Sequence, residues 1–199
     1  MNPTYRQRYA LAGLRAGDIV GFSGKGFVAD GINLGSFGIP RWGLSHIGIV
    51  AKYRGKLYIF ESTTLNKGKP CDIMGEACSG VQAHYLSDIL KRDGKVWRYE
   101  LIGGLSDEKS QKLTNNLLMH LGIAYDYFGA ARSGGVLLRK VEGLLRPEDL
   151  STFFCSELVA LMLDELGIIA IENASAQSPN SLGRKLVREY ITTYPKRIK

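Results

Sequence analysis

The stretch SHIGIVAKYRGKLYIFEST, residues 45–63, is the clearest structural signal in the chain. Two runs rich in β-branched and aromatic residues flank the pair Arg54-Gly55, and this arrangement is typical of a β-hairpin with a two-residue turn. Glycine readily adopts the positive φ that such a turn requires. The sequence therefore predicts two antiparallel strands that are joined at Arg54-Gly55.

The hairpin determines how two polar side chains, His46 and Glu61, lie relative to each other. With the turn at Arg54-Gly55, His46 is opposite Thr63 and Glu61 is its diagonal neighbour on the same face; with the turn one residue earlier, Glu61 is directly opposite. A three-residue turn would place Glu61 on the other face and break the pairing. If the two side chains do not form a functional pair, His46 is a strand histidine with its hydrogen bonds satisfied locally, and Glu61 is an edge residue that faces solvent. The face opposite His46 carries apolar residues suited to a core: Ile47, Ile49, Tyr58 and Phe60.

A second informative stretch is STFFCSELVALMLDELG, residues 151–167, in which Cys155 precedes the most apolar helix of the chain. Ser151 or Thr152 is a suitable N-cap, which predicts Cys155 in the first helical turn. Unpaired N–H groups and the helix dipole at that position favour a thiolate and an oxyanion. A small, inert, buried cysteine is the more common fate of this residue type, so the nucleophile remains one of two interpretations.

The other segments complete a single α+β domain over residues 1–199, with no repeat and no break in composition. We expect an N-terminal helix within 1–13, a strand at GDIVGFSG, a loop over 64–80, and strand, short helix and strand over 81–101. Asp18 is expected to be structural. A capped helix follows Ser106 and ends at Gly122, and a last helix begins at Pro179. Residues 188–199 are expected to form a basic tail.

Charge and cysteine content limit the function classes. The net charge is +7, much of it near the two ends, which favours either a solvated basic surface or contact with an anionic surface or polymer. No nucleic-acid motif is recognised, so no specific nucleic-acid partner is expected. Three cysteines do not make a disulfide framework, and Cys71, Cys78 and His84 lack the paired spacing of a zinc site. His84 and His120 have no evident partner.

The start of the chain lacks the continuous apolar core of a secretory signal, and no run is long enough to span a bilayer. We therefore expect a protein that is cytoplasmic, or released without a signal peptide, and that is not an integral membrane protein. Its oligomeric state is left open.

Together, five short stretches resemble the circularly permuted papain-like hydrolases, in particular the YiiX/YaeF-like group of the NlpC-type cysteine peptidases and amidases. They are LRAGDIVGFSG, SHIGIVAKYRGKLYIFES, GIAYDYFG, FFCSELVALMLDELG and SPNSLGR, and they extend from about residue 14 to residue 186. The resemblance implies a small antiparallel sheet or half-barrel packed against helices. In this permuted order the histidine strand precedes the cysteine helix.

The same resemblance implies site residues. Cys155 is the implied nucleophile, His46 the general base and then acid, and Glu61 the group that orients His46. Tyr125 and Ser156 are the implied oxyanion or substrate-binding residues, with Tyr127 as a second candidate for the tyrosine; Asp126 is expected to be structural.

The implied function is a cysteine hydrolase that cleaves a peptide, an isopeptide or a cell-wall-type amide through a thioester, without a cofactor or metal. One alternative is a thiol acyltransferase or lipase-like enzyme acting on a lipid ester at a membrane surface. The context Phe-Cys-Ser-Glu differs from the Asn-Cys-Glu-His context of the related lipid acyltransferases and argues against it. The other alternative is a binding module that keeps the fold without catalysis.

Overall fold

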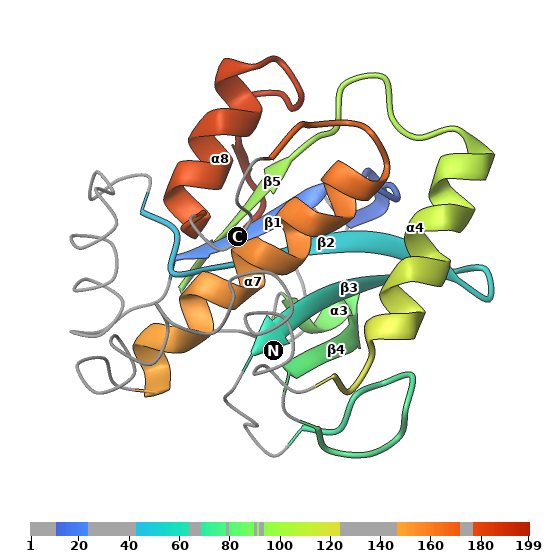
Figure 1. Ribbon diagram of the computed structural model, residues 1–199. Coiled ribbons are helices and arrows are strands. Elements are labelled where there is room, and N and C mark those ends of the chain that lie inside the picture. Colours follow the sequence, from blue (N-terminus) through green and yellow to red (C-terminus); the bar gives the residue numbers. More distant parts are fainter. Residues whose placement is uncertain are drawn as a thin grey trace.

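An antiparallel sheet organises the molecule (Figure 1). The computed structural model describes residues 11–23, 43–63, 69–78, 80–89, 91, 94–123, 147–171 and 177–199, with the backbone alone for 89 and 147–154. The six strands of the sheet lie in the order β4-β3-β2-β1-β5-β6, and each pairs antiparallel with its neighbours. Their bounds are β1 Ile19–Ser23, β2 His46–Tyr53, β3 Lys56–Thr63, β4 Gly80–Tyr85, β5 Lys95–Tyr99 and β6 Lys196–Arg197. This mixture of helices and an antiparallel sheet is the expected α+β class.

The hairpin of β2 and β3 has the two-residue turn that the sequence predicts. Tyr53 pairs with Lys56, and both turn residues have positive φ, 47° at Arg54 and 79° at Gly55. This is the backbone of a type I′ turn, whose twist matches that of the two strands. From Tyr53 and Lys56 the paired residues continue to Ile49 opposite Phe60. This is the alignment expected for a turn at Arg54-Gly55, the first of the two expected registers.

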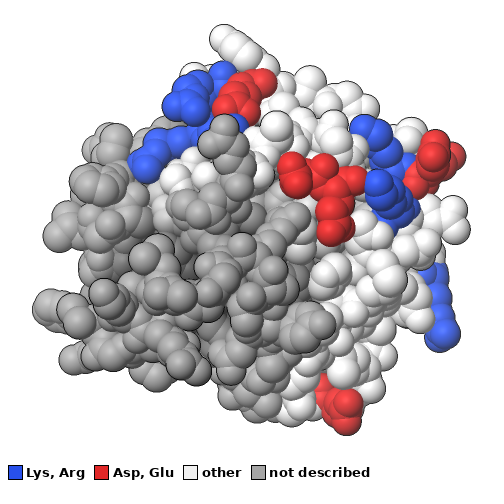
Figure 2. Space-filling view, viewed as in Figure 1, with Lys and Arg blue, Asp and Glu red and all other residues white. Residues whose placement is uncertain are grey.

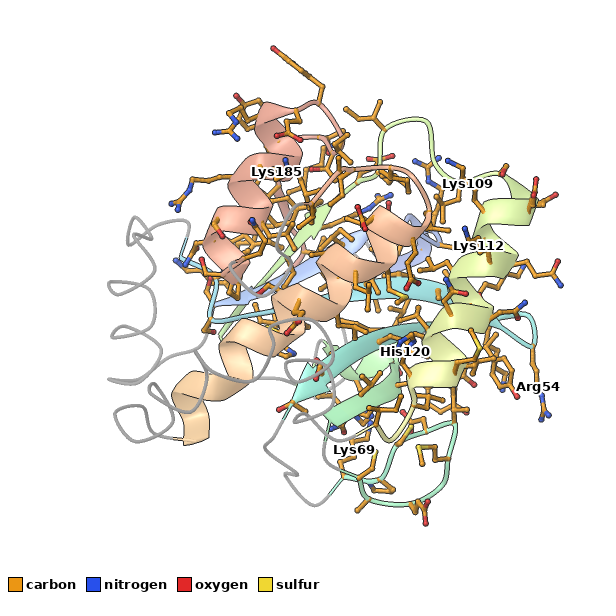
Figure 3. The ribbon with its side chains drawn as sticks, in the orientation of Figure 1. Arg54, Lys69, Lys109, Lys112, His120 and Lys185 are labelled. Atoms are coloured by element: carbon orange, nitrogen blue, oxygen red, sulfur yellow. The ribbon has the colours of Figure 1, made fainter. Side chains whose placement is uncertain are left out.

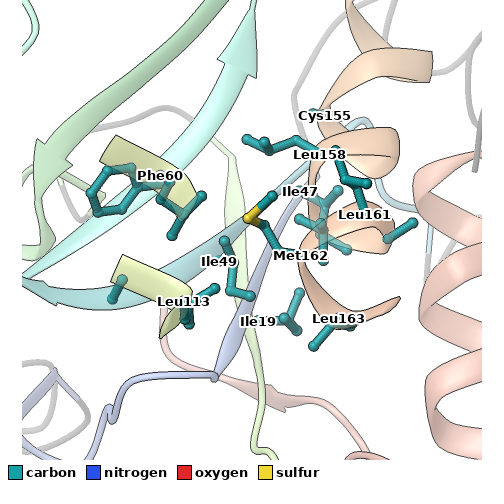
Figure 4. Close-up of a cluster of buried hydrophobic side chains, with 14 of the residues drawn as sticks. Ile19, Ile47, Ile49, Phe60, Leu113, Cys155, Leu158, Leu161, Met162 and Leu163 are labelled. Carbon is teal, nitrogen blue, oxygen red and sulfur yellow. The ribbon is translucent and has the colours of Figure 1, made fainter. Parts of the chain in front are cut away.

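The two faces of the sheet carry separate hydrophobic clusters, as the alternation along β2 and β3 requires. One cluster contains Ile47, Ile49 and Phe60 together with side chains of helices α4 and α7. The other contains Val50 and Ile59 with residues from β1, β5 and the C-terminus. In Figure 1 the helix α7 (Pro147–Glu165) crosses the sheet in front of β1 and β2. In Figure 4 its side chains, among them Leu158 and Met162, lie beside Ile47 and Ile49.

The start of α7 differs from the expectation. The helix begins at Pro147, not at Ser151 or Thr152, so Cys155 lies eight residues beyond its first residue, about two turns inside it. Proline is a favoured first helical residue. The expectation that Cys155 sits at a helix N-terminus is therefore wrong, and so is the activation by free N–H groups that it implied.

Three other expected helices agree with the structure. In α4 (Asp107–His120) the Ser106 side chain accepts a hydrogen bond from Lys109 N, and Gly122 follows the helix with φ of 72°. Helix α8 (Pro179–Arg188) begins at the expected proline, with Ser178 as its N-cap. The short helix α3 (Leu86–Ile89) lies between β4 and β5, as expected.

The C-terminal segment is not a free tail along its whole length. Lys196–Arg197 form β6 on the edge of β5, and the backbone N–H of Ile198 donates to Val96 O at 2.8 Å. Ile198 is buried in the second cluster. Most of the expected N-terminal helix lies outside the described residues.

Charged side chains of both signs lie on the face of the molecule that Figure 2 shows. In the view of Figure 2, blue and red side chains lie next to each other and form no uniform patch. Near the C-terminus, Lys185 and Arg188 pair with Glu189, and Lys196 lies near Glu100. The expected contact with an anionic surface or polymer stays a prediction. Among the described helices, none combines the length and the apolar character that crossing a membrane requires.

Candidate functional site

His46 and Glu61 form a close pair at one end of the hairpin. His46 is the first residue of β2, and its Nε2 lies 2.7 Å from Oε2 of Glu61 on β3. The Glu61 side chain is 3% exposed and that of His46 is 19% exposed, so the pair is largely shielded from water while the imidazole keeps one accessible edge. The shared face predicted from the hairpin is confirmed by this contact.

Cys155 reaches the same imidazole from α7. The side chains of Cys155 and His46 are hydrogen-bonded, and because Nε2 faces Glu61, the nitrogen left for the sulfur is Nδ1. Burial opposes protonation of His46, but the charge of Cys155, its hydrogen bond and the interactions with Glu61 outweigh burial and raise the pKa of His46 to about 10. The imidazole thus lies between a sulfur and a carboxylate.

The surroundings of His46 restrict its ring. The ring of Phe22, on the neighbouring strand β1, has its centroid 5.7 Å from that of His46. Gly48 follows on the same face, where an added Cβ would lie 2.8 Å from the Phe60 carbonyl oxygen. The backbones of β2 and β3 thus approach each other too closely for a side chain at this position, which gives the glycine of the SHIG stretch a structural reason.

Three further polar side chains, those of Gln82, His84 and Asp72, continue the polar contacts from Glu61. The sequence did not predict that they lie together. Gln82 of β4 pairs with Glu61, and His84 lies two residues further on the same face. His84 Nε2 is 2.9 Å from Gln82 Oε1 and 3.8 Å from Glu61 Oε1, and its Nδ1 is 3.6 Å from Asp72 Oδ2. The expectation that His84 has no partner is wrong. The alternation Gln-Ala-His-Tyr places Gln82 and His84 on one face of a strand. The sequence does not show which strand pairs with it.

The other expected site residues have different positions. The Ser156 hydroxyl donates to the backbone carbonyl of Gln177, and this hydrogen bond connects α7 to the segment before α8. Its expected oxyanion or substrate role stays a prediction. Tyr125, Asp126 and Tyr127 lie outside the described residues. Asp18 is structural, as expected: its carboxylate accepts from three groups, namely Arg15 N, Leu101 N and Arg98 Nε.

Cys71 and Cys78 belong to the loop before β4. Their side chains are hydrogen-bonded to each other, and Cys71 Sγ also accepts from Ala83 N at 3.4 Å. Burial raises the pKa of Cys78, and the neighbouring Cys71 and Glu76 raise it further. Within the described part of the chain, no three or more His, Cys, Asp and Glu side chains are grouped so that they could hold a metal ion.

The comparisons with known proteins identify similar solved structures. No family model matches the sequence, and no curated protein matches it either. The crystal structure described as metalloprotein yiiX (DUF1105) from Escherichia coli O157:H7 is similar, with a TM-score of 0.55 and 17% sequence identity. The similarity covers 93% of this chain and 96% of that chain. The chain therefore has a YiiX-like fold.

Proposed function

We propose that this protein is a cysteine hydrolase that cleaves an amide bond in a peptide, an isopeptide or a cell-wall-type polymer. The observation that carries the proposal is the row of sulfur, imidazole and carboxylate formed by Cys155, His46 and Glu61. A nucleophilic cysteine needs a base within hydrogen-bond reach and a third group that orients the base. Among the described residues, this row supplies all three.

Interactions with Cys155 and Glu61 favour a protonated His46. A protonated His46 stabilises an anionic sulfur at Cys155, and Glu61 in turn stabilises the imidazolium. Because Cys155 lies inside α7 and not at its end, this activation depends on the imidazolium and not on the helix dipole.

The proposed reaction has two steps. The Cys155 thiolate attacks the carbonyl carbon, and the C–N bond breaks as His46 transfers its proton to the leaving nitrogen, so that a thioester remains. His46, now neutral, then takes a proton from a water molecule whose oxygen attacks the thioester carbon. The C–S bond breaks, the acid leaves, and the thiolate and imidazolium are restored. Glu61 holds the imidazole in orientation through both steps.

The permuted papain-like architecture of the NlpC superfamily is part of the same proposal. It is supported by the chain order, in which the histidine strand β2 precedes the cysteine helix α7, and by the YiiX-like fold. The similar E. coli protein is described as a metalloprotein. The described residues of this chain do not fit a metal site, and no step of the proposed reaction uses one.

A substrate panel tests the proposal. Fluorogenic peptide amides, isopeptides and cell-wall-type amides are compared with matched esters, for the wild-type protein and for Cys155→Ala. We expect turnover of an amide, a trapped thioester on Cys155 by mass spectrometry, and loss of both in the variant. Turnover of lipid esters alone, with the acyl group passed to an acceptor, would favour the acyltransferase. Amide hydrolysis that persists in Cys155→Ala would remove the proposal.

One observation favours the alternative of a binding module. Cys155 is fully buried, so a substrate reaches its sulfur only when neighbouring side chains move aside. Alkylation by iodoacetamide separates the two cases, because it reports the reactivity of the sulfur without any substrate.

We expect Cys155 to react faster at pH 7 than Cys78, although Cys78 is more exposed, because the pKa of the Cys78 thiol is raised by its burial. Peptide mapping after timed alkylation measures both sites in one sample, so each molecule contains its own control. A rate at Cys155 no greater than at Cys71 and Cys78 would favour the binding module.

A further inference from the structure

The Glu61 carboxylate has two oxygens, and only one of them faces His46. Oε2 lies 2.7 Å from His46 Nε2, while Oε1 is turned toward His84 Nε2 at 3.8 Å. Both Glu61 and His84 are buried, with side chains 3% and 6% exposed. In such surroundings a carboxylate is sensitive to every charge and dipole beside it. His84 is therefore placed to influence how Glu61 faces His46.

The orientation of His84 is fixed from two sides. The Gln82 amide donates through Nε2 to the Cys78 carbonyl oxygen at 3.4 Å, which leaves Gln82 Oε1 to accept from His84 Nε2 at 2.9 Å. On the other side, His84 Nδ1 faces Asp72 Oδ2 at 3.6 Å. The same Asp72 oxygen accepts from the Tyr85 backbone N–H at 2.9 Å and lies 3.4 Å from Lys69 Nζ. The ring thus keeps its Nε2–H edge directed toward the Gln82 and Glu61 oxygens.

We propose that His84 is a positioning residue, which holds the Glu61 carboxylate in the orientation that its contact with His46 requires. This inference deepens the proposed function and rests on it for the expected effect on turnover. The effect on His46 itself needs no substrate. The polar row then continues beyond the three site residues, from Glu61 through His84 to Asp72 and Lys69 at the surface of the loop.

Two substitutions at one position separate positioning from space filling. His84→Leu removes the N–H group and nearly keeps the volume, whereas His84→Gln keeps an N–H donor. We expect His84→Leu to lower kcat about 10- to 100-fold with little change in KM, because a small misplacement of a catalytic group is enough for such a loss. We expect His84→Gln to recover most of the rate.

Nuclear magnetic resonance of the substrate-free protein gives an independent measurement. The imidazole signals of His46 are followed against pH, and the wild-type midpoint is expected at about 10. Since Glu61 contributes to that value, the midpoint should fall in His84→Leu and return toward the wild-type value in His84→Gln. Asp72→Asn, outside the site, should lower it by a smaller amount and serves as the second variant if His84→Leu does not fold.

The outcomes distinguish this inference from the proposed function. If no amide is turned over by the wild-type protein, the proposed function fails, and the His46 midpoints alone decide the positioning role. Midpoints that are the same in the wild-type protein and in each folded variant would overturn it. So would equal losses of kcat in His84→Leu and His84→Gln, because both would then reflect packing only.

Discussion

Replacement of His46 by alanine is expected to lower kcat/KM for amide hydrolysis by about 10⁴-fold, the loss typical of removing one member of a catalytic triad. In the proposed mechanism His46 stabilises the attacking sulfur, protonates the leaving nitrogen and later activates water. The His46 side chain is hydrogen-bonded to both Cys155 and Glu61. The rate of Cys155 alkylation should fall in the same variant, since the imidazolium that favours the thiolate is gone.

The pH profile provides a second signature of His46. Its pKa of about 10 means that the proton needed by the leaving nitrogen is retained through neutral pH and is lost as the pH rises through that value. We therefore expect kcat/KM of the wild-type protein to decline near pH 10. Steady-state rates between pH 7 and 11 measure this decline.

His120→Ala is the matched control for the histidine substitution. His120 is the last residue of α4, and its Nδ1–H donates to the Asn116 carbonyl oxygen at 2.6 Å. Figure 3 labels it on α4. Its removal should leave kcat/KM close to the wild-type value. A His46→Ala protein that is folded and still as active as His120→Ala would contradict the proposed mechanism.

Replacement of Asp18 by alanine is expected to lower the free energy of unfolding by about 3–5 kcal/mol, the range for breaking a buried ion pair. Asp18 is fully buried, and its Oδ2 lies 2.8 Å from Arg98 Nη2, whose side chain is 12% exposed. The carboxylate also accepts from the backbone N–H groups of Arg15 and Leu101. Without it, a largely buried guanidinium and two backbone donors lose their acceptor.

Urea denaturation followed by circular dichroism measures this loss, with two variants for comparison. Asp18→Asn keeps one oxygen acceptor without the charge and should lose less than Asp18→Ala. Glu189→Ala removes a carboxylate that pairs with Lys185 on the surface of α8, where ion pairs contribute little, and should be nearly neutral. A loss for Asp18→Ala as small as that for Glu189→Ala would show that the buried pair does not stabilise the fold.

The local features of the fold could be predicted because their causes lie within a few residues. The positive-φ pair Arg54-Gly55 determines the turn, and the turn determines which face of β3 carries Glu61. Ser106 and Ser178 are N-caps because their side chains accept from backbone N–H groups three residues ahead. The start of α7 could not be determined in the same way. Ser151, Thr152 and Pro147 are all suitable local starts, and the choice among them needs more than local preference.

The sequence by itself determined the hairpin, its register and the shared face of His46 and Glu61, because the side-chain period of two and the turn geometry act between neighbouring residues. Only the tertiary structure decided that Cys155 meets that imidazole, across the 109 positions from 46 to 155, and that His84 and Asp72 lie behind Glu61. These contacts arise when α7 packs on β2 and β3 and when β4 pairs with β3. Burial of apolar surface favours such packing, but it is not directional. The apolar pattern of the sequence therefore does not show which distant polar groups the packing brings together.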